Sequence, residues 1–303
     1  MPAIVCSYIN PDLDGIACSI ALEFLGRPQW SARLLGAIDA ETSVVLQDLG
    51  FTPPPAVDTW GDIDEIWLVD THHPFQLPPD LPESRVTRIT DHHPGGDPRR
   101  YPNADIQNES VGAAATLVSE RFEDMKAAIP PNLAMLLQAA IISNTLNFLA
   151  PATCHRDRNV YERLQSIKHV PDNLFDRMQQ ARTAVLRGET RSILRTDTKI
   201  FETECGPVIV SQLEAPGALE LLARSDLTDS LEEMAASAKC SSAVVNLVDT
   251  VLCNSAVVAT DSRITLRIAA GIQQSPGGDG VIRIDRLLQR KTDIIPYIVT
   301  ARS

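Results

Sequence analysis

Apolar runs of strand length alternate, in the first part of the chain, with segments whose apolar residues recur at three- and four-residue spacing. A strand followed by a helix, repeated in this way, is typical of a doubly wound α/β domain with a parallel sheet. The predicted strands are residues 3–8, 32–35, 63–69 and 86–90, and the predicted helices are residues 16–24 and 40–49.

Beyond about residue 110 the pattern becomes helical, with predicted helices at residues 111–122, 131–149, 157–167 and 171–186. A short polar stretch with a glycine follows at residues 187–190, and we place a domain boundary there. The predicted domains are therefore residues 1–188 and residues 189–303.

The second domain has a pattern of strand-like and helix-like segments that is typical of a smaller α/β domain. One of its predicted helices starts with a proline, which the first helical turn tolerates. The predicted strands are residues 199–202, 207–212, 243–250, 255–260 and 264–269, and the predicted helices are residues 216–223, 227–238 and 284–289.

Composition narrows the class of protein. A chain of 303 residues with 44% hydrophobic and 22% charged residues is globular and long enough for two domains. Its net charge of −12 argues against nucleic acid or an anionic membrane as the main partner. An anionic substrate would therefore need local cations or a metal.

The cysteines and the apolar runs indicate a cytoplasmic protein. The six cysteines show no CxxC spacing, and we interpret them as reduced thiols. Apolar runs stay below the ~18 residues of a membrane span, and the N-terminus lacks the pattern of a secretory signal.

Acidic and imidazole side chains follow three of the predicted strands. Ligands of open α/β sheets bind at the carboxyl ends of the strands, where neighbouring parallel strands meet. Carboxylates brought together there repel unless a cation compensates, and a mixed carboxylate and imidazole set suits Mn²⁺, Co²⁺ or Zn²⁺ better than Ca²⁺. The three sets are Asp12 with Asp14, Asp70 with His72 and His73, and Asp91 with His92 and His93.

Each of these features also has a plainer interpretation. Asp12 and Asp14 follow a strand and precede a helix, so they could act only as helix N-caps. His72 and His73 could be solvated loop residues. The basic residues Arg290 and Lys291 could mark the end of a helix, where cations are favourable.

The order and spacing of the motifs resemble the DHH phosphoesterase superfamily, and within it the family II, manganese-dependent inorganic pyrophosphatases. The resemblance covers nearly the whole chain. The motifs are Asn10-Pro11-Asp12-Leu13-Asp14, Leu68-Val69-Asp70, Asp91-His92-His93, Val111-Gly112 with Ala115-Thr116, Ile142-Ser143-Asn144-Thr145-Leu146, Asp197-Thr198-Lys199 and Arg290-Lys291.

The resemblance implies a metal-binding DHH domain, a smaller DHH-associated phosphate-binding domain, and an active site in the cleft between them. Two metals roughly 3.5–4 Å apart would activate a water and clamp the phosphate oxygens. The implied cofactor is Mn²⁺ or Co²⁺, with Mg²⁺ as an alternative. The implied metal ligands are Asp12, Asp14, Asp70, His92 and Asn144, and the implied catalytic and phosphate-binding residues are His93, Lys199, Arg290 and Lys291.

Three positions depart from the family pattern. Tyr8 stands where the first motif has a metal-binding histidine, and Asn144 stands where the fourth has an aspartate. Both changes weaken metal binding, because a phenol is a poor neutral ligand and an amide carries no charge. Thr71 replaces a histidine, so His72 or His73 could serve as a substitute ligand; we favour exposed loop imidazoles instead.

The expected activity is hydrolysis of a phosphoanhydride, with pyrophosphate as the first choice of substrate and short-chain polyphosphate as the second. A degenerate homologue that binds phosphate or nucleotide with little activity is the alternative from a different class. A nuclease for short oligonucleotides is a weaker alternative, because the histidine-containing, glycine-rich C-terminal motif of that branch is not visible. The expected partner is a small anionic phosphate, and the resemblance also allows a homodimer.

Overall fold

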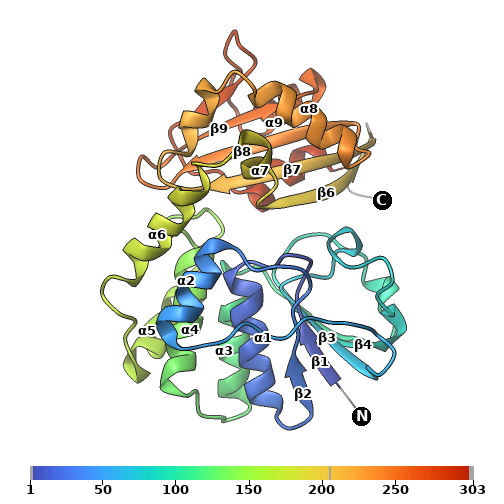
Figure 1. Cartoon of the computed structure of the whole chain (residues 1–303), viewed down its shortest axis with the longest axis vertical. Helices are drawn as coiled ribbons and strands as arrows, with labels where there is room; N and C mark the ends of the chain where they lie inside the picture. Colours follow the sequence, from blue (N-terminus) through green and yellow to red (C-terminus); the bar gives the residue numbers. More distant parts are fainter. Residues whose placement is uncertain (1–2, 205, 300–303) are drawn as a thin grey trace. The chain divides into compact units, whose positions relative to one another are not determined.

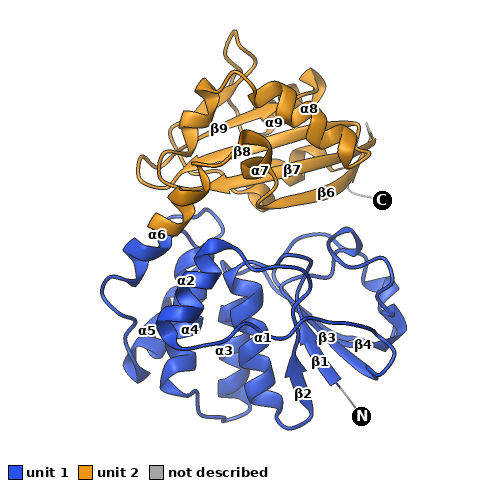
Figure 2. Cartoon of the chain, in the orientation of Figure 1, with its two compact units in different colours: residues 1–178 blue, residues 179–303 orange. Residues whose placement is uncertain are grey.

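The computed structural model describes residues 3–204 and 206–299, and divides the chain into two compact units, residues 1–178 and 179–303 (Figure 2). The division lies inside helix α6 (Leu174–Val185). The boundary predicted at residues 187–190 lies after this helix.

Unit 1 contains the predicted parallel sheet, in the strand order β2-β1-β3-β4-β5 (Figure 1). Every neighbouring pair is parallel, and therefore β1, β3 and β4 end at the same edge. The strands are β1 (Ala3–Cys6), β2 (Trp30–Ala32), β3 (Glu65–Val69), β4 (Val86–Asp91) and β5 (Asp105–Asn108).

The helices of unit 1 contribute to one hydrophobic core. Alternate strand residues such as Val5 and Val69 face this core, while Ile4 and Leu68 face a second core on the other side of the sheet. The second core is covered by 3₁₀ turns and loops that include Leu77. The helices are α1 (Leu13–Gly26), α2 (Ala40–Leu49), α3 (Ala114–Asp124), α4 (Pro131–Asn144) and α5 (His155–Ile167).

Unit 2 is a mixed sheet in the order β10-β9-β8-β7-β6. Only β7 and β8 pair in parallel among its described strands, because α8 (Leu227–Ser237) connects them as a crossover. Separate cores form on the two faces of the sheet. The strands are β6 (Thr198–Thr203), β7 (Gly206–Glu214), β8 (Ser242–Asp249), β9 (Asn254–Ala259) and β10 (Ile282–Ile284).

The strand predicted at residues 264–269 is wrong, because this segment belongs to helix α9 (Ser262–Gly271). Its β-branched residues, and its alternation of apolar and polar residues, are typical of a strand and led to that prediction. The helix instead buries Ile264 and Ile268, four residues apart, and leaves Leu266 61% exposed. Asp261 caps the helix by accepting a hydrogen bond from the Arg263 N–H.

Several other elements also differ from the sequence prediction, and the helix predicted at residues 131–149 ends at Asn144. The helix predicted at residues 284–289 is wrong: Ile284 ends strand β10, and the next helical segment is a π-helix, η5 (Arg290–Ile294), followed by α10 (Ile295–Ile298). The polar stretch 187–190 leads directly into helix α7 (Thr190–Leu194). Strand β5 was not predicted because three of its four residues are polar and both of its end residues are exposed.

Within the described residues, helices long and apolar enough to cross a membrane are absent. Cys6, Cys18, Cys154, Cys240 and Cys253 are free thiols, and Cys205 lies outside the described residues.

Candidate metal centre

The ends of β3 and β4 bring Asp70, His92 and His93 together. One potential ligand atom from each of these residues lies within 4.8 Å of the others. His92 Nε2 lies 3.1 Å from Asp70 Oδ1, and His93 Nδ1 lies 3.8 Å from the same oxygen. Asp70 is buried and has a φ of +62°, a left-handed conformation that aspartate tolerates better than most residues. The predicted convergence at this sheet edge is therefore present.

The hydrogen bonding of His92 is suited to a metal ligand. Its Nδ1 lies 2.9 Å from the Val111 carbonyl oxygen, which can only accept, so Nδ1 carries the proton. In the neutral ring, Nε2 then presents a lone pair toward the Asp70 carboxylate. A lone pair that faces a carboxylate is repelled by it unless a proton or a metal cation lies between them. Metal-binding histidines usually donate their other nitrogen in this way, and the Asp70 carboxylate together with the His92 imidazole fits a divalent transition metal.

Asp12 is the N-cap of α1. Its Oδ1 accepts hydrogen bonds from the Asp14 and Gly15 N–H groups at 3.0 and 3.2 Å. The Asp12 N–H in turn donates to Tyr8 Oη at 3.2 Å, and Tyr8 is buried. The phenol that replaces the family histidine therefore holds the turn that carries Asp12.

Asp14 is buried in the first turn of α1 and contacts Asn144. The Asn144 Nδ2 donates to Asp14 Oδ2 at 2.9 Å and lies 3.4 Å from His92 Nε2. Burial and the Asp70 charge raise the pKa of Asp14 to about 8, with a further increase from Asp12, against lowering by His92 and by the Ala115 N–H. The five predicted ligands thus come from one region of unit 1, connected through these contacts.

Sequence reasoning missed the role of His72, which we expected to be a loop imidazole. His72 is 2% exposed, and its Nδ1 lies 2.5 Å from Asp91 Oδ2. The expectation of an exposed side chain is wrong for His72, since the loop at Gly95 and Gly96 folds over it; a Cβ on Gly96 would come within 2.1 Å of its Nε2. His73 is half-buried and contacts the Pro94 carbonyl oxygen.

Asp91 organises the signature motif around one buried carboxylate. Its Oδ1 accepts from the N–H groups of His92 and His93 and from His93 Nδ1, at 2.7, 3.1 and 2.9 Å. Burial acts to raise its pKa, but the His93 charge and the hydrogen bonds of His72 and His93 hold the pKa of Asp91 well below its ordinary value. Asp91 is therefore a carboxylate that fixes the orientation of His93.

Asp157 is a second residue that the sequence pattern did not single out. This fully buried carboxylate accepts from the Gly112 N–H with both oxygens, at 3.1 and 2.9 Å, and from Thr116 Oγ1 at 2.6 Å. It fixes the loop whose Val111 carbonyl oxygen contacts His92 and whose Gly112 carbonyl oxygen accepts from Asn144. Its place at the start of α5, typical of an N-terminal acid, was the only signal in the sequence.

The predicted basic residues lie in unit 2. Lys199 and Arg290 are buried, and Lys291 is half-buried. Arg290 Nη2 lies 2.9 Å from Asp197 Oδ1, and Nη1 contacts the Asp197 and Val210 carbonyl oxygens at 3.3 and 3.4 Å. The guanidinium is therefore held in a fixed position by Asp197, just before β6, and by Val210 of β7.

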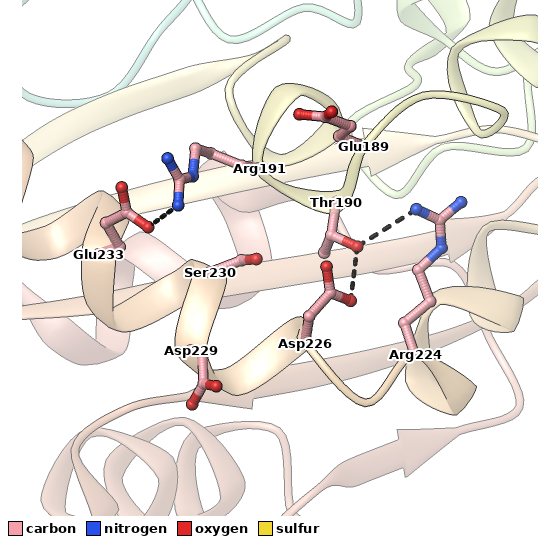
Figure 3. Close-up of a pocket in the computed structure, with 8 residues that line it drawn as sticks. All are labelled: Glu189, Thr190, Arg191, Arg224, Asp226, Asp229, Ser230 and Glu233. Carbon is pink, nitrogen blue, oxygen red and sulfur yellow. Dashed lines mark hydrogen bonds and ion pairs between the residues drawn. The ribbon is translucent and has the colours of Figure 1, made fainter.

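Unit 2 also contains a polar pocket of about 440 Å³ at the start of α7 and α8 (Figure 3). Thr190 Oγ1 donates to Asp226 Oδ1 at 2.8 Å and accepts from Arg224 Nη1 at 3.2 Å. Arg191 forms an ion pair with Glu233. These side chains satisfy one another, and we assign them a structural role in joining α7 to α8.

Comparison with known proteins agrees with this architecture. The sequence model of the DHH family, N-terminal domain, matches residues 2–141, and that of the DHHA2 domain matches residues 176–301. A probable manganese-dependent inorganic pyrophosphatase of Lactobacillus acidophilus is 30% identical over 232 residues, covering 73% of each chain. The manganese-dependent inorganic pyrophosphatase of Methanothrix thermoacetophila is 26% identical over 306 residues, covering 98% of this chain and 97% of the relative.

Among solved structures, a Methanococcus jannaschii protein provisionally classed as a family II inorganic pyrophosphatase has the same fold, with a TM-score of 0.84, 24% identity and 97% of each chain covered. Fold and domain order together define a DHH-family protein with a DHHA2 second domain. Within that class, the chain belongs to the family II, manganese-dependent inorganic pyrophosphatases. The resemblance indicated by the sequence motifs is confirmed.

Proposed function

We propose that this protein hydrolyses inorganic pyrophosphate to two phosphates, with Mn²⁺ as its divalent cation. The observation that carries the proposal is the convergence of Asp70, His92 and His93 from two neighbouring strand ends. The names of the relatives supply the substrate and the metal. A cytoplasmic location and a homodimer stay predictions of the sequence.

Asp70 and His92 would hold the cation, and the resemblance adds Asp12, Asp14 and Asn144 as predicted ligands. A divalent cation there would acidify a water and draw charge from the phosphate oxygens. Val111 keeps the proton of His92 on Nδ1, which leaves Nε2 for binding.

His93 is the proposed proton donor to the leaving phosphate. In the doubly protonated ring, His93 Nδ1 donates to the carboxylate of Asp91 at 2.9 Å, so the proton that His93 would transfer is the one on Nε2. Because the pKa of Asp91 is lowered, this carboxylate stays an acceptor and holds the ring in one orientation. Lys199, Arg290 and Lys291 would bind the phosphate charge, Arg290 in two places and the lysines as point charges.

The test is phosphate release from pyrophosphate, tripolyphosphate and longer polyphosphate, each with Mn²⁺, Co²⁺ or Mg²⁺. We expect Mn²⁺-dependent release from pyrophosphate that falls by ~10²–10⁴ in His93→Ala, the usual contribution of a proton-transferring residue. His169→Ala, which removes an exposed histidine of the same unit, is the matched control.

Comparing the three substrates distinguishes a pyrophosphatase from a polyphosphatase and from a phosphate-binding homologue with little activity. Faster release from tripolyphosphate than from pyrophosphate would identify a polyphosphatase. Release no greater than that of His93→Ala with every metal would overturn the proposal and favour the degenerate phosphate-binding homologue, for which Tyr8 and Asn144 are the motivating changes.

A further inference from the structure

The Asp14 carboxylate is surrounded by hydrogen-bond donors from the protein itself. Oδ2 accepts from the Ala114 N–H at 2.7 Å and from Asn144 Nδ2 at 2.9 Å. Oδ1 accepts from the Ala115 N–H at 2.9 Å and from Cys18 Sγ at 3.5 Å. A carboxylate has about four lone-pair sites, and these four donors account for them.

Two of these donors give Asp14 a structural role. Helix α3 begins at Ala114, and its N-cap, Ala113, has no side-chain oxygen to accept from the first turn. Asp14 supplies this acceptor from another helix, about a hundred residues earlier in the chain. The carboxylate therefore joins α1 to the start of α3.

The orientation of the Asn144 amide follows from its neighbours. Nδ2 lies 2.9 Å from Asp14 Oδ2 and 3.1 Å from the Gly112 carbonyl oxygen, and the carbonyl oxygen can only accept. The opposite orientation would place the Asn144 oxygen against two oxygens, so the amide nitrogen must face them. The Gly112 backbone cannot turn away, because Asp157 holds its N–H with both oxygens.

We propose that the amide of Asn144 takes the place of a second cation, so that this protein binds one divalent ion, on Asp70 and His92, and not two. This inference rests on the proposed function and revises the predicted roles of Asp14 and Asn144 as ligands. The amide carries no net charge, but its partly positive N–H groups donate to Asp14 where a cation would otherwise compensate the carboxylate, and Asp14 and Asn144 together form a hydrogen-bonded support for the site.

The substitution Asn144→Asp reverses this arrangement. A carboxylate oxygen would then face Asp14 Oδ2 and the Gly112 carbonyl oxygen, with no donor among the three. Buried carboxylates that lie so close to each other repel strongly unless a cation lies between them. We therefore expect Asn144→Asp to create a second cation site.

The experiment counts Mn²⁺ ions per chain by elemental analysis after gel filtration, and records the electron paramagnetic resonance spectrum of the same samples. We expect one ion with the spectrum of isolated Mn²⁺ in the wild-type protein. We expect two ions with an exchange-coupled spectrum in Asn144→Asp. Asn103→Asp, which adds the same charge at an exposed position of unit 1, should bind one ion.

Two ions in the wild-type protein, or one in a folded Asn144→Asp variant, would overturn the inference. The wild-type count needs no variant and therefore decides the question even if Asn144→Asp does not fold. Phosphate release assayed on the same samples separates the two proposals. Two ions with phosphate release would refute the single-ion site alone, whereas no ion and no release would refute the proposed function as well.

Discussion

His72 and Asp91 form a buried pair, with 2.5 Å between His72 Nδ1 and Asp91 Oδ2. The other oxygen of the same carboxylate accepts from His93 Nδ1. Asp91 therefore lies between two imidazoles, one of which is the proposed proton donor. His72 fixes the carboxylate that orients that ring.

Replacing His72 should impair turnover more than substrate binding. In His72→Leu, Asp91 loses a donor and His93 loses its fixed orientation, so we expect kcat for pyrophosphate to fall ~10–100-fold with little change in KM, as for other residues that support a site indirectly. In His72→Asn, the amide can donate in place of Nδ1 and should restore much of kcat. Equal losses in the two variants would contradict a positioning role.

The same pair should make stability depend on pH in the metal-free protein. Burial opposes protonation of His72, but the hydrogen bond and charge of Asp91 raise its pKa above 6.5. The stabilisation from His72 is therefore complete below pH 6.5 and is lost as the pH rises through its raised pKa. Asp91, whose pKa is lowered well below 3.8, stabilises above pH 3.8 and ceases to do so as the pH falls through that lowered value.

We therefore expect the stability difference between the wild-type protein and His72→Asn to be largest between pH 3.8 and 6.5. Urea unfolding with a chelator, at about pH 5 and about pH 9, measures this difference. His169→Asn provides the exposed control. A difference that grows toward alkaline pH would contradict the assignment.

Gly112 should not tolerate a side chain. A Cβ at this position would lie 2.7 Å from both Asp157 Oδ2 and Thr145 Cγ2. We expect Gly112→Ala to lower the free energy of unfolding by about 1–3 kcal/mol, the usual cost of overpacking a filled interior. Gly61→Ala is the matched control, because its nearest neighbour would be Thr59 Oγ1 at 3.6 Å. Thermal unfolding of the two variants gives the comparison, and equal stability would be evidence against this packing.

Arg290 should act mainly on substrate affinity. Asp197 already fixes its guanidinium, so that little side-chain freedom is lost when a phosphate binds. We expect Arg290→Ala to raise KM for pyrophosphate about 10–100-fold, which corresponds to the loss of about 1.5–3 kcal/mol for a hydrogen bond to a charged group. Arg283→Ala, which removes an exposed arginine paired with Asp279, should leave KM unchanged. Steady-state kinetics of both variants measures KM. An unchanged KM in Arg290→Ala would contradict the proposed role of Arg290 in phosphate binding.

The sequence predicted those parts of the site that depend on local pattern. Runs of apolar residues predict the buried strands, and neighbouring parallel strands end at one edge of the sheet. The sequence alone therefore predicts that Asp70 and His92 lie close together. The pairing of His72 with Asp91 depends on the loop at Gly96, and the contact of Asp14 with Ala114 spans most of unit 1. Tertiary packing alone determines such contacts.

Local pattern also explains the errors in unit 2. The segment from Ile264 to Ala269 alternates like a strand, but its helix is decided by the Asp261 cap and by the core that receives Ile268. In unit 1, three of the four residues of strand β5 are polar, so only its pairing with β4 identifies it. Periodicity predicts which face is buried, and it fails where a residue's neighbours come from a distant part of the chain.

The location of the cation tests the central claim most directly. Anomalous diffraction at the manganese edge, from crystals grown with Mn²⁺ and a non-hydrolysable pyrophosphate analogue, locates the ion without reference to activity. We predict an anomalous peak in contact with Asp70 and with Nε2 of His92, whose Nδ1 still donates to the Val111 carbonyl oxygen. The absence of a peak at Asp70 and His92, with either residue paired only to protein groups, would contradict the account.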